Sequence, residues 1–328
     1  MKIYKLKCNV LTPIHIGDGT EIYPYEYVIK DKFYKISLED FILNLQPEKQ
    51  NEVINLIEKD VIGLRQFLQK NFDPTKHKFE YSIEASQRIK MVYETKIHNE
   101  LNQLLISPFI RTSNKPYIPG SSLKGAIRTA VVANFFQKQN SKFKSEPEIL
   151  QYCDENKKID LTRDPFRGIK ITDAILAENS TIIEEITTIT KTGEIKTNRE
   201  VVYPEVQFCS ELRLDDELYN LYEKMKLKFD IETISKSCNN FYKETLIKYE
   251  NKYFHDRNKP EVKKIYEQIY SIRLDNNSFL LRIGWGSGKN SVSLNLKLQK
   301  PEYIKTRKLI ERKYPLGWIK VKIEKEES

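Results

Sequence analysis

Polar and apolar side chains alternate over the first ten residues, which predicts a strand with one buried face. Tyr4, Leu6, Cys8 and Val10 lie on one side, and lysines and an asparagine lie on the other. Other alternating runs predict further strands along the chain. These are a strand pair within 25–36, single strands at 79–83, 109–111 and 169–172, the run FLLRIGWGSG, and a last strand at 319–323.

Apolar residues recur every three or four positions in two other parts of the chain, which predicts helices there. Ser37 followed by Asp40 is typical of a capping box, in which the serine accepts from a free amide of the new helix. After Pro47 the helical spacing resumes at Val53, Ile54, Ile57, Val61, Leu64 and Leu68. Residues 215–275 predict an all-helical insertion packed against the sheet. Its first apolar positions are Leu218, Leu221, Tyr222 and Met225.

The segment TTITKTGEIKTNREVVYPEVQF predicts a long basic hairpin, with β-branched residues flanking a turn at Thr192 and Gly193. Because strands and helices are interleaved and separated by long insertions, we expect an α+β domain rather than a helical bundle or a β-sandwich. The expected division is a sheet domain at 1–214 with the hairpin at about 187–203, a helical insertion at 215–275, and C-terminal strands with a glycine-rich loop at 276–328.

The composition is that of a well-solvated globular protein, with 39% hydrophobic and 31% charged residues among 328. No run approaches the roughly 18 apolar residues of a membrane span, and the N-terminus lacks a signal-peptide core. We therefore expect a cytoplasmic protein without a membrane partner. The cysteines are far apart and form no CxxC pair, so we expect buried thiols, no metal site and no cofactor. They are Cys8, Cys153, Cys209 and Cys238.

The formal net charge of +9 and a pI near 9.0 favour a polyanionic partner. Basic side chains gain affinity for phosphates by releasing condensed counterions. Charge alone does not establish that partner, because many basic cytosolic proteins bind no nucleic acid.

The stretch PYIPGSSLKGAIRTA leads a rigid turn into a basic helix. Ser121 or Ser122 is expected to cap a helix that begins at Leu123, whose first amides suit a phosphate. Lys124 and Arg128 share a face and add charge. The alternative is an ordinary capped helix with a solvated basic face. The RNA-binding residues predicted here are Gly120, Ser121, Ser122, Lys124, Gly125 and Arg128.

The loop RIGWGSGKNS places three glycines at alternate positions after an apolar strand. It is not a Walker A loop, because Asn290 follows Lys289, and it lacks the third glycine of a dinucleotide fingerprint. Trp285 either stacks on a base or belongs to the core. The RNA-binding residues predicted here are Gly284, Trp285, Gly286, Ser287, Gly288 and Lys289.

Two smaller groups of residues complete the candidate site. His15 and Gly17 lie in a glycine-rich loop, where the histidine is either a general base for RNA cleavage or a hydrogen-bonded structural residue. Arg163 and Arg167 would add a basic rim. Asp164 and Asp173 bracket PFRGIKIT as possible metal ligands, although aspartates at strand ends are usually turn formers.

These motifs together resemble one known family. The stretch YIPGSSLKGAIRTA, the histidine-glycine loop after the first strand and LRIGWGSG look like the RAMP superfamily of CRISPR effector proteins. DPFRGIKITDA, the hairpin leading into YPEVQFCSEL, and YPLGWIKVKIE are similar to the subunits that cap the 3′ end of the crRNA in type III-A Csm complexes. The resemblance spans nearly the whole chain.

The resemblance implies a ferredoxin-like, RRM-like βαββαβ core with inserted helices. It also implies a non-catalytic subunit for crRNA binding and maturation in antiviral defence. Its partners would be crRNA, the repeated backbone subunit and the small helical subunit. The aromatic RRM motif is absent, so loops and helix N-termini would hold the RNA. Backbone subunits carry a cleaving aspartate after the first strand, but Asp18, Glu26 and Asp31 match it in no clear way.

Three hypotheses follow. The first is an RNA-binding assembly subunit that uses the residues above, with the 187–203 hairpin as a counterpart of the backbone subunits' thumb. The second is a metal-independent ribonuclease that processes repeat RNA, with His15 as base. The third is a scaffold in which residues 215–275 serve only protein contacts.

Overall fold

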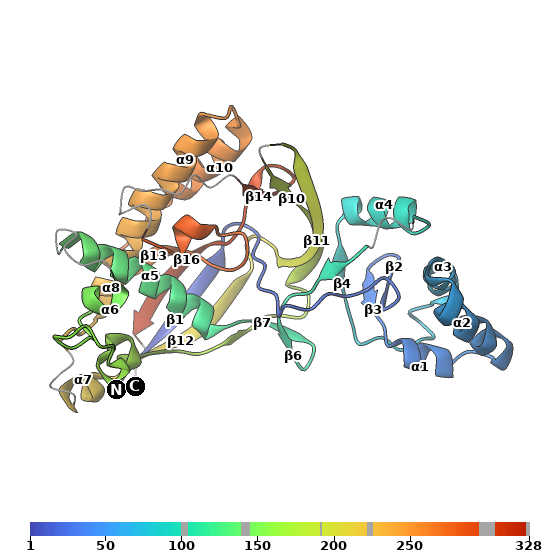
Figure 1. Cartoon of the computed structure of the whole chain (residues 1–328), viewed down its shortest axis with the longest axis horizontal. Coiled ribbons are helices and arrows are strands. Elements are labelled where there is room, and N and C mark those ends of the chain that lie inside the picture. The colour runs from blue at the N-terminus through green and yellow to red at the C-terminus, as the bar shows by residue number, and fades with distance from the viewer. Residues whose placement is uncertain (100–103, 139–144, 191, 222–225, 295–305, 326–328) are drawn as a thin grey trace.

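The computed structural model describes residues 1–328 except 100–103, 139–144, 191, 222–225, 295–305 and 326–328. Figure 1 shows a larger body, which contains both termini, and a smaller lobe to its side. None of the described helices has the length and apolar character needed to cross a membrane.

The larger body is built on an antiparallel sheet of five strands. They are β1 (Lys2–Val10), β8 (Ile169–Ile171), β12 (Gln207–Leu214), β13 (Ser278–Arg282) and β16 (Trp318–Lys325). Their order in space is β13-β16-β1-β12-β8. The predicted alternation of β1 is confirmed. Leu6, Cys8 and Val10 are buried under the helices, whereas Lys5 and Lys7 are exposed on the open face.

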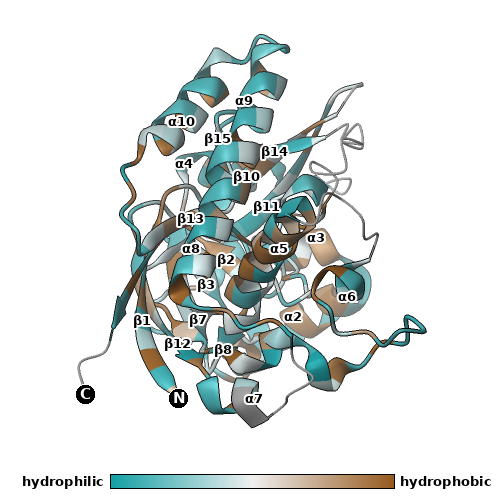
Figure 2. Ribbon diagram, turned by 90° about the vertical axis from the view of Figure 1, so that its left-hand side faces the viewer, coloured by the Kyte–Doolittle hydropathy of each residue, from teal (hydrophilic) through white to brown (hydrophobic). Residues whose placement is uncertain are grey.

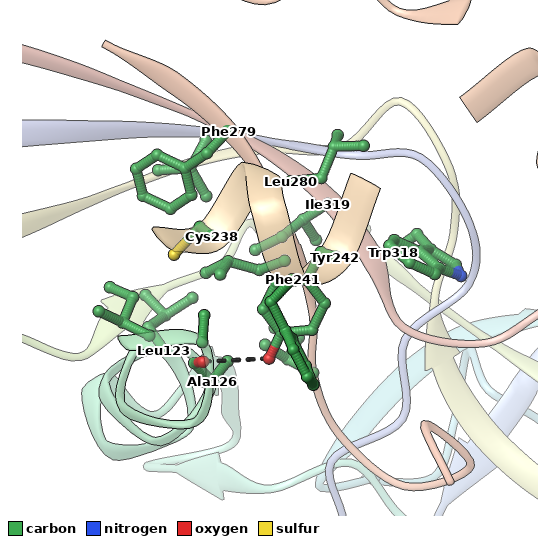
Figure 3. Close-up of a cluster of buried hydrophobic side chains, with 14 of the residues drawn as sticks. Leu123, Ala126, Cys238, Phe241, Tyr242, Phe279, Leu280, Trp318 and Ile319 are labelled. Carbon is green, nitrogen blue, oxygen red and sulfur yellow. Dashed lines mark hydrogen bonds between the residues drawn. The ribbon is translucent and has the colours of Figure 1, made fainter. Parts of the chain in front are cut away.

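Two helical segments cover one face of this sheet and enclose the main core. They are α5 (Gly120–Lys138) and α8 (Ile231–Cys238), which continues as the π-helical stretch η3 (Asn239–Ile247). The Tyr242 hydroxyl of η3 donates to the carbonyl of Ala126 in α5 at 3.0 Å (Figure 3). Trp318 of β16 lies fully buried beside it. The ribbon of α5 is brown over much of its length in Figure 2, which matches its many buried residues.

Four strands and two helices of this body follow the βαββαβ order. The strand β1 leads through α5 to β8, and β12 leads through α8 to the distant β16. In the spatial order β16-β1-β12-β8, the two parallel strands of each βαβ unit are not neighbours. The strand β12 lies between β1 and β8, and β1 lies between β12 and β16, as in a ferredoxin-like sheet. The strand β13 is an added edge. The fold is therefore α+β, with a ferredoxin-like core and helical insertions, as predicted.

A second sheet is built around the predicted hairpin. This hairpin is confirmed as β10 (Thr181–Ile189) and β11 (Glu194–Val202), and it begins before residue 187. Along one edge β10 pairs with β11, and on its other edge it pairs with β14 near residues 186–189 and, in parallel, with β4 near residues 182–183. The remaining strands of this sheet are β2 (Tyr27–Ile29), β3 (Phe33–Lys35), β4 (Tyr81–Ala85), β5 (Ile106–Ser107), β14 (Arg307–Ile310) and β15 (Tyr314–Pro315).

The strands β2, β3 and β4 belong to the smaller lobe, which has two apolar clusters of its own. Its helices are α1 (Leu38–Leu43), α2 (Pro47–Lys59), α3 (Val61–Asn71) and α4 (Gln87–Lys96). Ser37 caps α1 as expected, because its hydroxyl accepts from the amide of Asp40 at 3.2 Å. The predicted helical positions from Val53 to Leu68 are confirmed, and they are divided between α2 and α3. Asp60 separates the two helices and caps α3 through the amide of Gly63.

Other elements are short or belong to residues 215–275. They are β6 (Arg111–Thr112), β7 (Lys115–Ile118), β9 (Ala174–Ile175), α6 (Glu146–Ile149), α7 (Asp216–Leu221), α9 (Lys248–His255) and α10 (Pro260–Ser271), with 3₁₀ turns η1 (Leu161–Arg163), η2 (Pro165–Gly168) and η4 (Lys289–Ser291).

Residues 109–110 are not a strand, which corrects one prediction. Tyr222 and Met225 lie outside the described residues. Only two of the four thiols are buried, those of Cys8 and Cys238.

Candidate nucleic-acid interface

The start of α5 differs from the predicted cap. The helix begins at Gly120 rather than Leu123, and the Gly120 amide donates to Asp173 Oδ1 at 2.7 Å. A carboxylate from the following β8–β9 turn therefore caps the helix, and neither Ser121 nor Ser122 is needed for it. Gly120 is required here, because a Cβ would lie 2.2 Å from the carbonyl oxygen of Ile171.

The first turn of α5 is open to solvent. Ser121 and Gly125 are exposed and Ser122 is half-buried. A Cβ on Gly125 would meet no atom within 4 Å. Lys124 is half-buried, and burial lowers the pKa of its ammonium group. A polyanion can therefore reach this turn, although Asp173 already occupies its first amide.

Arg128 is not the free cation that the sequence suggested. Its guanidinium pairs with Glu146 at 2.6 Å and with Asp164 at 2.9 Å, and it lies 4.8 Å from the centre of the Phe166 ring. The two carboxylates offset its charge, because the helix places it against α6 and the η1–η2 segment.

The side chains predicted to form a basic rim or to bind a metal also form ion pairs or hydrogen bonds within the protein. Arg163 pairs with Asp160 at 2.9 Å, and Arg167 donates to the carbonyl of Thr162 at 2.8 Å. Asp164 and Asp173 are occupied by Arg128 and the Gly120 amide. Within the described residues, no cluster of three or more His, Cys, Asp or Glu side chains is arranged to hold a metal ion.

The three acidic residues considered after the first strand also serve local structure. Asp18 accepts from the Thr20 amide at 2.8 Å. The Glu26 carboxylate accepts from the Tyr23 amide at 2.8 Å, and Asp31 accepts from the Tyr34 hydroxyl at 2.9 Å.

The His15 loop and the glycine-rich loop meet directly, although they are about 270 positions apart in the chain. The Trp285 amide donates to the His15 carbonyl at 2.8 Å. Gly284 has φ +78°, and a Cβ there would lie 2.4 Å from the same carbonyl. The Trp285 indole is half-buried and meets the His15 ring edge-on at 5.9 Å. Gly17, Gly288 and Lys289 are exposed around this contact, and Gly286 and the buried Ser287 lie between them.

Hydrogen bonds fix the protonation state of His15. Its Nε2 lies 3.1 Å from the Arg199 guanidinium, which can only donate, so Nε2 accepts and carries no proton. Its Nδ1 therefore carries the proton and donates to the Glu200 carbonyl at 2.7 Å. Burial lowers the pKa of His15 to about 4. His15 is thus a neutral, hydrogen-bonded residue in the wall of the site.

Two cations meet Trp285 and were not among the predicted site residues. The Arg199 guanidinium of β11 lies 3.8 Å from the ring centre, and the Lys308 ammonium of β14 lies 3.9 Å from it. Burial lowers the pKa of both groups, and for Lys308 the charge of Arg199 adds to this effect. Within the described part of the chain, neither cation forms an ion pair with a carboxylate. This arrangement favours an added anion.

An open cleft of about 400 Å³ borders this cluster. His15 and Arg199 line its inner side, and the loop from 17 to 23 lines its rim with Ser107. The buried face of α5 reaches the end of the glycine-rich loop only through the core, where the Tyr242 hydroxyl lies near the carbonyls of Ala126 and Ser291. The predicted residues on the exposed first turn of α5 do not line the cleft. The structure thus brings together the His15 loop and the glycine-rich loop, with α5 close behind them.

Only a weak sequence signal was available for the two cations. Arg199 is one of several basic residues in the hairpin, and nothing in the local pattern separates it from Lys196. Lys308 is the second residue of the short strand β14, where no longer pattern marks it. Their partnership arises only when β11 and β14 pair on either side of β10.

Comparison with known proteins identifies the class to which this fold and site belong. Residues 7–291 match the RAMP superfamily, so the chain belongs to that superfamily. Within it, the chain is similar to proteins named Csm5. It is 27% identical to "CRISPR system Cms protein Csm5" of Methanocaldococcus jannaschii over 87% of this chain and 71% of that one. The Csm5 of Streptococcus thermophilus is 26% identical over 56% of this chain and 54% of that one.

Solved structures give the same fold. One chain of a "Csm-crRNA-target RNA ternary complex in type III-A CRISPR-Cas system" superimposes with a TM-score of 0.76 at 20% identity, covering 98% of this chain and 100% of that one. The crystal structure of T. onnurineus Csm5 gives a TM-score of 0.70 at 20% identity, with 95% and 99% covered.

Proposed function

We propose that this chain is a non-catalytic, crRNA-binding subunit of a type III-A Csm effector complex. It caps the 3′ end of the crRNA and supports crRNA maturation and complex assembly in antiviral defence. Its neighbours would be the repeated backbone RAMP subunit and the small helical subunit, in the cytoplasm. The similarity to Csm5 proteins and to a chain of a Csm–crRNA complex supports this assignment.

The observation that carries RNA binding is the pair of cations on Trp285. Arg199 and Lys308 are half-buried, form no ion pair among the described residues and lie on the ring of Trp285 in the glycine-rich loop. Glu21 lines the same cleft, and its charge acts on Arg199 without an ion pair. A phosphate between them would relieve their mutual repulsion, and Trp285 offers a flat surface to a base. The positive-φ glycines let the backbone approach a sugar-phosphate chain closely.

The first turn of α5 has a secondary part in this proposal. Ser121, Ser122 and Gly125 would contact the guide backbone, with Lys124 as the charged group. Arg128 would act by holding the turn in place, because Glu146 and Asp164 already offset its charge. Arg163 and Arg167 remain candidates for an outer rim.

The state of His15 supports a binding role rather than catalysis. A general base needs a free lone pair within reach of the proton that it abstracts. The only lone pair of the His15 ring accepts from Arg199. His15 and Gly17 would shape the cleft without acting on the RNA.

The test is a double substitution, Arg199→Ala with Lys308→Ala, measured by filter binding of guide-like RNA at several salt concentrations. We expect affinity to fall by on the order of tenfold or more, because each hydrogen bond to a charged group contributes about 1.5–3 kcal/mol. The slope of log affinity against log salt should drop by about one to two units.

The matched control is Lys59→Ala with Lys70→Ala, which removes the same charge from exposed helix ends in the smaller lobe. This control should leave both the affinity and the slope nearly unchanged. Equal losses in the two double variants would mean that only net charge matters, and the assigned site would be abandoned.

A further inference from the structure

The open cleft beside His15 has room for more than a phosphate group. Its volume of about 400 Å³ falls within the roughly 300–1,000 Å³ of pockets that hold whole small molecules. Arg199 supplies a cation at the inner side of the cleft. A phosphate bound there would leave most of the volume free, so the rest of the wall is available to another part of the same ligand.

Tyr23 gives this cleft an aromatic wall. The residue lines the cleft and is 45% exposed. Two aromatic residues of the adjoining strands, Tyr27 and Phe33, are by contrast fully buried in the core of the smaller lobe. Tyr23 therefore contributes little of its ring to the folded core, and its surface is open to a flat ligand in the cleft.

The ring of Tyr23 is supported by a second ring. Tyr25 stacks on it, with the ring centres 5.5 Å apart and the planes inclined by 14°. Tyr25 is half-buried and packs against the apolar cluster of the smaller lobe that contains Val28 and Phe41. The stack thus anchors Tyr23 to the lobe while it covers one face of the ring.

Hydrogen bonds also fix the backbone on both sides of Tyr23. The Ile22 amide donates to the Ile106 carbonyl at 2.8 Å, and the Ile106 amide donates back at 3.1 Å. The Glu26 amide donates to the Tyr23 carbonyl at 2.9 Å, and the Glu26 carboxylate accepts from the Tyr23 amide at 2.8 Å. A ring that is held in place before the ligand arrives loses little conformational freedom on binding, which favours affinity.

We infer that Tyr23 is a stacking platform and that the cleft takes one unpaired nucleotide of the guide RNA, with its base on the Tyr23 ring and a phosphate on Arg199. The inference rests on the proposed function, to which it adds a contact with a base. Stacking on an aromatic side chain accepts every base, because each base has a flat π-face. A base within a duplex is covered by its neighbours, so the contact selects an unpaired nucleotide without selecting a sequence.

The experiment measures the affinity of the full chain for guide-like single-stranded RNA in which one abasic position is moved along the strand. For the wild-type protein, one position should weaken binding by about fivefold to a hundredfold, which is the contribution of one stacked base. Tyr23→Ala should weaken binding of the intact RNA by a similar factor. It should lose no further affinity when that position is abasic, because the two changes remove the same contact.

Two other substitutions separate the ring from its size and charge. Tyr23→Phe keeps the ring and should bind as the wild-type protein does, whereas Tyr23→Leu keeps an apolar side chain without a ring and should bind as weakly as Tyr23→Ala. None of these variants removes a charge, so the slope of log affinity against log salt should stay the same. Tyr270→Ala removes another exposed tyrosine, from α10, and as the matched control should keep the full affinity.

Full affinity of Tyr23→Ala or Tyr23→Leu for intact RNA overturns the inference and leaves the proposed function intact. The inference is also wrong if the loss at the abasic position persists unchanged in Tyr23→Ala. Failure of the wild-type protein to bind any guide-like RNA contradicts the proposed function itself.

Discussion

His15 is the residue whose chemistry is most closely defined by its surroundings. Arg199 donates to one ring nitrogen and the Glu200 carbonyl accepts from the other. Burial among Ile14, Phe109 and Trp285 disfavours the charged ring, which lowers its pKa to about 4 from the ordinary 6.5. At neutral pH the side chain is a spacer that orients Arg199 toward the cleft.

This lowered pKa makes stability depend on pH with a definite sign. Below pH 6.5 the unfolded chain binds a proton at His15 that the folded chain does not bind until about pH 4. The free energy of unfolding should therefore be complete above pH 6.5 and should fall as pH drops toward 4, by about 3 kcal/mol at most. Urea unfolding at pH 7.5 and 5 should show a smaller drop for His15→Gln.

The same variant tests the ribonuclease hypothesis. Labelled repeat RNA incubated with the wild-type protein and a chelator should remain intact, as it should with His15→Gln. An NMR resonance of His15 that titrates near pH 6.5 would contradict the protonation state, and cleavage lost in His15→Gln would establish the enzyme.

The sequence pointed to the proposed interface better through its loops than through its charges. Gly284 and His15 were recognisable because a loop that needs positive φ or close approach is rich in glycine in the sequence itself. Arg199 and Lys308 were not, because a cation becomes a site only where carboxylates are missing in three dimensions. For Arg128 the sequence pattern likewise did not show its surroundings. Its carboxylate partners lie 18 and 36 positions away, beyond any local pattern.

At the scale of elements, α5 depends on two glycines for opposite reasons. Gly120 lies where a Cβ would meet the Ile171 carbonyl at 2.2 Å, whereas a Cβ on Gly125 would meet nothing within 4 Å. Gly120→Ala should therefore destabilise the protein by about 1–3 kcal/mol, because the helix start must move away from β8. Gly125→Ala should stabilise it by about 0.5–1 kcal/mol, as expected within a helix.

These two variants also report on RNA. If the guide backbone passes close to the first turn of α5, the methyl group of Gly125→Ala should weaken binding while thermal melting shows a more stable protein. Unchanged affinity in that variant would mean that the RNA does not approach Gly125. Gly120→Ala serves as the contrast, because its loss of binding would follow its loss of stability.

Individual strands were predictable from the sequence, whereas the pairing of strands that lie far apart in the chain was not. The alternation in β1 and β16 survives in the structure because the helices cover one side and solvent the other. The apolar run FLLR also predicted β13, which is buried on both faces, and the aromatic residues within 25–36 predicted β2, which is only three residues long. The smaller lobe was missed because its strands pair with the hairpin β10 across about 100 positions, which no local periodicity records.

For the whole molecule, the helical segment 215–275 is part of the core rather than a removable addition. Cys238, Phe241 and Tyr242 pack against α5 and β16 (Figure 3). In the ferredoxin-like order, α8 and η3 supply the second crossover of the sheet. A scaffold role for this segment cannot be tested by deleting it, because the deletion would expose the main core.

The two tryptophans report separately on the fold and on the site. Trp318 is fully buried between Tyr242 and Tyr266, whereas Trp285 is half-buried and contacts the cations of Arg199 and Lys308. Guide RNA should therefore change the fluorescence of Trp285 and leave that of Trp318 as it is. In Trp285→Phe the RNA-induced change should disappear, while urea should still shift the Trp318 emission to the red. A change that persists in Trp285→Phe would mean that RNA binding reaches the core, and the assigned interface would be wrong.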